Sequence, residues 1–165
     1  MQETAIQLYI QEESKLYSPY DPSREKLNDE VYKYLKSFCI DRVNTVTQFD
    51  KIQIISDAPI DGDRFRENLR KAVKTDQEAL DWQLEVNNKR AVWEYIVGIG
   101  LSVLGFILSI YLDKVLLGVV SFFGSLVLKE AVQIGTKVNP DIKHDKNRLT
   151  PLAASEVEVI LNTGK

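Results

Sequence analysis

Only one cysteine and one histidine occur among the 165 residues. One cysteine cannot form a disulfide within the chain, and this usage suits a reducing compartment. One Cys and one His are too few for a zinc site without several carboxylates, so we expect neither a metal nor another cofactor. The histidine, His144, follows Lys143 and precedes Asp145 in a charged segment. Because no nucleophile is adjacent, a solvated side chain is a better interpretation than a general base.

An excess of basic residues is also missing, since the formal net charge is −3. The sequence therefore shows no basic stripe of the kind that nucleic acid requires. The opening segment MQETAIQLYIQEESK is acidic, and it predicts no secretory signal peptide. The Gly98-Ile99-Gly100 element lies in an apolar run and lacks the following Lys-Ser or Lys-Thr of a phosphate loop. Without an acid, a base and a nucleophile in one pattern, we expect a protein that is not an enzyme.

A long apolar stretch dominates the second half of the sequence. Tyr95 to Leu112 is a run of eighteen uncharged residues, and Val115 to Leu128 adds fourteen more after Asp113-Lys114. At about 1.5 Å of rise per residue the first run spans about 27 Å as a helix, close to the hydrocarbon thickness of a bilayer. We therefore predict a transmembrane helical hairpin over residues 92–136, with Asp113-Lys114 at its tip. The second run reaches only about 21 Å, which requires tilt or a shortened span.

Charges outside the two runs set the expected orientation. Lysines and arginines lie just before the hairpin and just after it, while its tip carries one Lys and one Asp. The positive-inside rule then places both termini in the cytoplasm, with the protein in the inner (plasma) membrane of a cell. The alternative is a soluble protein that buries the hairpin, but about 120 remaining residues are too few to wrap it.

Small residues recur at helical spacing on one face of each predicted span. Small side chains allow helices to approach closely in lipid, so we expect the two spans to pack along this seam. The seven positions are Gly98, Ser102, Gly105 and Ser109 on the first span and Gly118, Ser121 and Ser125 on the second.

Three ionisable residues, Glu94, Lys129 and Glu130, lie near the ends of the two spans. Folding the hairpin about its tip brings Glu94 close to Lys129, and we expect an ion pair there. The alternative is that the three charges line a pore in an assembly of several copies, because ionisable groups in membranes often mark pathways.

Outside the hairpin the sequence predicts a small cytoplasmic α/β part. Alternating apolar residues predict three strands, and the helix expected over Asp29–Val43 has Asn28 or Asp29 as its cap. A second helix begins at Asp61 or Asp63 and continues as a stalk toward the membrane, whereas Pro140 and Pro151 predict a polar segment without a helix. The strands are 5–10, 51–56 and 156–161; the segments are 1–60 (α/β part), 61–91 (stalk), 92–136 (hairpin) and 137–165 (tail with the final strand).

The last strand is expected to return to the sheet and to hold the two ends of the hairpin together. The fold class is thus a membrane α+β protein: two membrane helices, and a cytoplasmic domain of three short strands and two helices. On the stalk, Arg66, Arg70 and Lys74 share one face at i, i+4 spacing. They form a candidate surface for an anion or an acidic partner, and the alternative is an ordinary salt-bridged helix surface.

The order of these elements carries a resemblance. The chain contains, in order, the segment Tyr20-Asp21-Pro22-Ser23-Arg24-Glu25-Lys26, an amphipathic helix, the segment Asp61-Gly62-Asp63-Arg64-Phe65-Arg66 and a hairpin. This layout resembles a family of small uncharacterised bacterial two-span membrane proteins. That resemblance brings no activity with it. In layout alone the chain is also similar to two-span effectors encoded beside bacterial anti-phage sensors, which is an analogy of architecture.

These observations favour a self-associating membrane protein, with the lipid bilayer and further copies of itself as partners. Its cytoplasmic part would control the hairpins, as in a pore-forming or membrane-disrupting effector. The alternative is a membrane-anchored adaptor that recruits a cytoplasmic protein. A third hypothesis, an intramembrane enzyme subunit, lacks the required acid, base and nucleophile.

Overall fold

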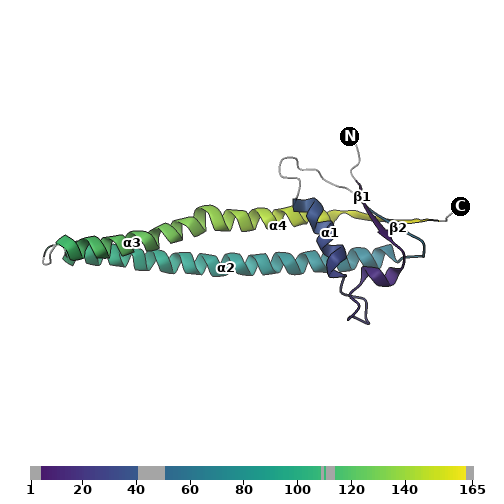
Figure 1. Cartoon of the computed structure of the whole chain (residues 1–165), viewed down its shortest axis with the longest axis horizontal. Coiled ribbons are helices and arrows are strands. Elements are labelled where there is room, and N and C mark those ends of the chain that lie inside the picture. The colour runs from purple at the N-terminus through teal and green to yellow at the C-terminus, as the bar shows by residue number, and fades with distance from the viewer. Residues whose placement is uncertain (1–4, 41–50, 109, 111–113, 163–165) are drawn as a thin grey trace. The chain divides into compact units, whose positions relative to one another are not determined.

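The computed structural model describes residues 5–40, 51–108, 110 and 114–162 (Figure 1). The chain is mostly helical, with one small parallel sheet and two long apolar helices. It divides into two compact units. The sheet unit comprises residues 1–78 and 145–165, and the hairpin unit comprises residues 79–144.

Three parallel strands form the sheet in the order β1-β2-β3, with bounds β1 (Ala5–Ile10), β2 (Lys51–Ser56) and β3 (Glu156–Leu161). Leu8 pairs with Ile54, and Ile54 pairs with Val159. The predicted return of the last strand to the sheet is therefore confirmed. Every second residue of β1 is buried, because one face of the strand packs against the core while the other does not.

Helices supply the rest of the core of the sheet unit. They are α1 (Asp29–Ile40), the beginning of α2 (Gly62–Leu108) and the end of α4 (Asn139–Ala154). A short 3₁₀ helix, η1 (Glu13–Leu16), precedes α1 in the chain. The helix side chains that are almost fully buried with the strands are Leu35, Phe65, Leu69, Val73 and Leu152. The opposite face of the sheet leaves Tyr9 and Ile160 exposed.

Two helix caps place α1 and α2. The Asn28 side chain accepts the amide of Glu30 at 3.0 Å, and the Asp61 side chain accepts the amide of Arg64 at 3.0 Å. Each cap satisfies an amide that has no partner inside its helix. A side chain at Gly62 would begin only 3.0 Å from a methyl carbon of Val159, so glycine lets the start of α2 approach β3.

The hairpin unit contains the second part of α2, then α3 (Lys114–Gln133), the π-helix η2 (Ile134–Val138) and the start of α4. Two helical stretches, Gly62–Leu108 and Gly118–Ala154, are long and apolar enough to cross a membrane by length and composition. In each stretch, only 17% of the most apolar 18-residue segment is buried by the rest of the chain.

The expectation that residues 137–150 form no helix is wrong. Pro140 has no amide hydrogen to complete an α-helical hydrogen bond. The helix nevertheless continues, because it widens into the π turn of η2 immediately before the proline, and the amide of Asn139 bonds to the carbonyl of Ile134. A local π turn is a common way for a helix to accommodate an interrupted hydrogen-bond ladder. Pro151 lies in the last turn of α4, which ends at Ala154.

Candidate functional site: the helix seam and its charged end

The two helices of the hairpin unit approach each other closely at Gly98 on α2 and Gly124 on α3. A Cβ atom added at Gly98 would lie 2.6 Å from Cγ of Leu128 and 3.3 Å from the carbonyl oxygen of Gly124. A Cβ at Gly124 would lie 3.1 Å from the Ser102 hydroxyl. Both glycines are buried, so the backbones meet where only a hydrogen atom fits between them.

The predicted seam residues fall into two groups. Gly98 and Gly105 are buried. Ser102 and Ser121 are exposed but lie at the seam: the Ser102 hydroxyl is 3.1 Å from a Cβ at Gly124, and the Ser121 hydroxyl is 3.7 Å from a Cβ at Gly105. Gly118 and Ser125 are exposed, and no described heavy atom lies within 4 Å of a Cβ at Gly118. Ser109 lies outside the described residues. The seam of α3 therefore follows Ser121, Gly124 and Leu128, so Ser121 agrees with the prediction and Gly124 takes the place of Ser125.

Gly124 was missed by the sequence analysis, although a signal for it exists. Ala91, Gly98 and Gly105 are spaced seven residues apart, and so are Gly124 and Ala131. All five are buried in the hairpin unit. A repeat of small residues every seventh position keeps one side of a helix narrow along its length. Gly118 and Ser125 are also seven residues apart, so the repeat adds Gly124 to the candidates but does not by itself select it over Ser125.

A cluster of charges lies at the end of this seam. Nε of Arg90 donates to Oε1 of Glu94 at 2.7 Å, and Nη2 of the same guanidinium donates to Oε1 of Glu130. The expected pair of Glu94 with Lys129 is thus replaced by one arginine that joins both carboxylates. An Arg guanidinium is suited to this role because its donors form a rigid, planar fork.

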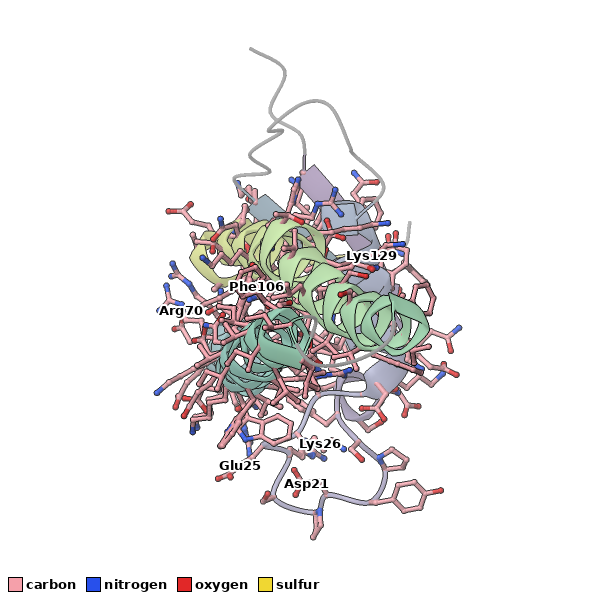
Figure 2. The ribbon with its side chains drawn as sticks, turned by 90° about the vertical axis from the view of Figure 1, so that its left-hand side faces the viewer. Asp21, Glu25, Lys26, Arg70, Phe106 and Lys129 are labelled. Atoms are coloured by element: carbon pink, nitrogen blue, oxygen red, sulfur yellow. The ribbon has the colours of Figure 1, made fainter. Side chains whose placement is uncertain are left out.

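Glu94 is the most enclosed member, with its side chain only 17% exposed. Its second carboxylate oxygen, Oε2, is buried and has no hydrogen-bond partner among the described residues. Beside the cluster is an open cavity of about 340 Å³, lined by Arg90, Lys129 and Glu130 together with apolar residues that include Leu126. Lys129, labelled in Figure 2, lies in the last part of α3, which ends at Gln133.

A polar contact between helices lies beyond the charged cluster, where Asn88 of α2 meets Asn139 of α4. Nδ2 of Asn139 donates to Oδ1 of Asn88 at 2.7 Å, and Asn139 is only 7% exposed. Oδ1 of Asn139 is buried with no partner among the residues that the structure describes. Asn139 directly follows the π turn, so a buried amide joins α2 to α4 where the helix geometry changes. A buried Asn fixes the alignment of two helices at a cost in stability.

The predicted surface of Arg66, Arg70 and Lys74 does not act as one set of free cations. Nε of Arg66 is buried, and Nε of Arg70 (Figure 2) donates to the carbonyl of Ala153 at 3.2 Å. That carbonyl belongs to the last turn of α4, so Arg70 caps the helix that leads into β3. Lys74 remains exposed and lies 3.7 Å from Glu78.

The sheet unit also contains an ordered loop around Asp21, labelled in Figure 2. The Asp21 carboxylate accepts the hydroxyl and amide of Ser23 and the amides of Glu25 and Lys26. These hydrogen bonds, among which that from the Ser23 hydroxyl has the largest effect, lower the pKa of Asp21 to about 2. The bonds hold the turn in which Arg24 has a φ of 55°. The loop is thereby fixed by its own residues.

Comparison of the chain with protein-family models, with curated proteins and with solved structures finds no match in any of the three. In the described part of the chain, no three His, Cys, Asp or Glu side chains are grouped so that they could hold a metal ion. The Arg90 cluster and the seam perform two physical tasks: they hold two apolar helices together, and they pair two carboxylates with one guanidinium at the end of an apolar surface.

Proposed function

We propose that the protein is a self-associating integral membrane protein of the inner membrane, with both termini in the cytoplasm. The supporting observation is the exposure of the hairpin, since only 17% of the 18-residue apolar segment of each long helix is buried by the chain. The exposed side chains are large and apolar, among them Ile96, Ile99, Phe106, Phe122 and Phe123. Such a surface is stable only when lipid or another protein covers it.

Chain connectivity supports control of the hairpin by the sheet. β2 leads into α2 at Gly62, and α4 leads directly into β3 at Glu156. The hairpin is therefore an insertion between two paired, parallel strands. A ligand or partner that moves β3 relative to β2 also moves the bases of both helices, because the helices are covalently continuous with the strands. This arrangement fits a pore-forming or membrane-disrupting effector.

Flux through a purified membrane is the direct test. The full chain is reconstituted in vesicles of anionic and zwitterionic phospholipid, and release of a trapped dye and of ions is recorded. The proposal expects release that grows steeply with the protein-to-lipid ratio. An assembly that is intact in mild detergent by light scattering but never permeabilises vesicles would contradict the pore.

The charged end of the seam provides a variant for the same assay. If Glu130 lies along the conducting path, Glu130→Lys shifts the preference of the pore from cations toward anions. Glu67→Gln is the matched control, because Glu67 is an exposed helix carboxylate in the sheet unit, paired with Lys71. Equal ion selectivity in the two variants would show that Glu130 does not line the conducting path. The flux test of the pore itself would still stand.

The second candidate is an adaptor that recruits a cytoplasmic protein to the membrane. The observation in its favour is the open face of the sheet, where Tyr9 and Ile160 are exposed, although parallel sheets are normally covered on both faces. Ile160→Asp should abolish recovery of such a partner, whereas Lys74→Glu on α2 should leave it unchanged. Recovery that survives Ile160→Asp would exclude this face.

A further inference from the structure

A second apolar stripe runs along α2, separate from the seam. Its positions alternate in steps of three and four residues over four heptads, which is the repeat that packs one helix against another. The stripe consists of Ala79, Trp82, Val86, Lys89, Trp93, Ile96, Gly100, Val103 and Ile107. All nine residues are exposed in the chain, so we call them the outer stripe.

The outer stripe lies opposite the surface that packs on α3. Trp93 follows Ala91 by two residues and Gly100 follows Gly98 by two, which corresponds to about 160° of separation around the helix. Ala91 and Gly98 are buried in the seam. Because α3 occupies the inner side of α2, the outer stripe is free to contact a different molecule.

Lipid alone does not account for the beginning of the outer stripe. Trp82 and Val86 are 66% and 42% exposed, and Trp82 precedes the uncharged run at Tyr95 by thirteen residues. At about 1.5 Å per residue this places Trp82 about 20 Å before the run, beyond the hydrocarbon core. The intervening residues include charged groups such as Glu85 and Lys89. Trp82 and Val86, four residues apart on α2, form a short exposed apolar strip that lipid tails do not reach and that a protein surface can cover.

Periodicity and charge favour the α2 helix of a second copy as that surface. Two copies inserted with the same topology present parallel α2 helices, and the outer stripe then supplies matching layers. In a parallel pair with this repeat, Glu85 of one copy lies opposite Arg90 of the other. Nη1 of Arg90 is available, since the bonds to Glu94 and Glu130 use Nε and Nη2.

Two further residues of the outer stripe bear on this packing. A Cβ at Gly100 would meet nothing within 4 Å among the described atoms, so a neighbouring helix can approach closely there. Lys89 interrupts the apolar pattern, but its ammonium lies 2.7 Å from Glu85 in its own chain. This ion pair holds the Lys89 ammonium on the side of α2 that carries Glu85, beside the outer stripe.

We propose that copies of the protein associate through the outer stripe of α2, with Trp82 and Val86 extending the contact beyond the membrane. The inference rests on the proposed function, since it assigns the surface by which the membrane protein self-associates. It predicts that the contact between copies involves α2 with α2, in parallel orientation and at equivalent residues.

Disulfide crosslinking in vesicles tests the contact. Cys39 is first replaced by serine, and Val86→Cys is compared with Lys143→Cys, an exposed position on α4. Equivalent residues of parallel helices meet at the same level, so Val86→Cys should form dimers under mild oxidation. The dimer fraction should exceed that of Lys143→Cys by roughly tenfold, the ratio that corresponds to about 1.4 kcal/mol of preference.

Each result has a separate meaning. If the protein is oligomeric by light scattering but Val86→Cys crosslinks no better than Lys143→Cys, the outer stripe is not the contact and the self-associating membrane protein stands. If the protein is a single chain at every protein-to-lipid ratio, self-association itself fails and both proposals fall. Strong crosslinking at Val86 that also persists after dilution with excess lipid supports the outer stripe.

Tryptophan fluorescence supplies a second measurement that needs no cysteine. The chain contains two tryptophans, so Trp93→Phe leaves Trp82 as the only reporter. Quenching of Trp82 by acrylamide should decrease as the protein-to-lipid ratio increases. Adding Val86→Gln should weaken association by roughly tenfold, because burial of a valine contributes more than about 1.4 kcal/mol, and should restore quenching. Quenching that is independent of concentration would overturn the proposal.

Discussion

Gly98→Ala is expected to destabilise the hairpin, although alanine is the better helix former. Alanine in place of glycine stabilises an unconstrained helix by about 1 kcal/mol. At Gly98, however, the new methyl group would lie 2.6 Å from Cγ and 2.8 Å from Cδ2 of Leu128 and 3.3 Å from a backbone oxygen. Overpacking of this kind costs about 1–3 kcal/mol. The net change is therefore a loss of up to about 2 kcal/mol.

The same substitution at Gly118 is the matched control, because no described atom lies within 4 Å of a Cβ there. Gly118→Ala should gain about 1 kcal/mol, and Gly105→Ala should fall between the two, since its Cβ lies 3.3 Å from Val120. The assay is denaturant unfolding of the full chain in mild detergent, followed by circular dichroism. Equal stabilities for Gly98→Ala and Gly118→Ala would refute the close approach of the helices.

Three further predictions concern ionisable groups. Arg90→Gln should lower the unfolding free energy by about 1–3 kcal/mol, because it leaves the enclosed Glu94 carboxylate without its partner. Adding Glu94→Gln to the same chain should recover most of the lost stability. A double variant as unstable as Arg90→Gln alone would contradict this explanation. The pKa of Asp21, held at about 2 against 3.8 by hydrogen bonds, contributes stability that is present above pH 3.8 and is lost as the pH falls toward 2. Asp21→Asn should flatten the measured stability in that range, and an unchanged acid profile would count against the loop. Burial raises the pKa of the Cys39 thiol to about 11, so alkylation at pH 8 should be much slower in the folded chain than in denaturant; equal rates would show that the thiol is accessible.

The sequence predicts the sheet well because its signals are local. Alternation of apolar residues in all three strands gives the same bounds that the structure shows. Capping also depends on short-range chemistry, and Asn28 and Asp61 were among the expected caps. For the same reason α1 and α2 were expected close to where they begin.

The errors arise where an outcome depends on contacts between helices or on the geometry of a turn. In the sequence Pro140 predicts the end of a helix. In the structure a π turn just before Pro140 accommodates its missing amide hydrogen, and the helix continues as α4. Which residues of α3 face α2 depends on contacts between the two helices, so the sequence selected Ser125 where the structure places Gly124. Arg90 was placed outside the hairpin by its charge, although its side chain reaches Glu94 and Glu130.

The order of elements along the chain links completion of the sheet to formation of the hairpin. β3 follows α3 and α4 in the sequence, and it supplies the third strand that pairs with β2. Before that pairing, β2 presents unpaired backbone donors and acceptors on one side, and the core lacks Leu152. Contacts between residues this far apart in sequence form late, because closing the intervening segment is entropically costly. Folding of α2 and α3 into an antiparallel pair shortens the path between β2 and β3. The seam at Gly98 and Gly124 thus acts on the sheet as well as on the hairpin, and substitutions that open the seam should also lower the protection of β3 amides from hydrogen exchange.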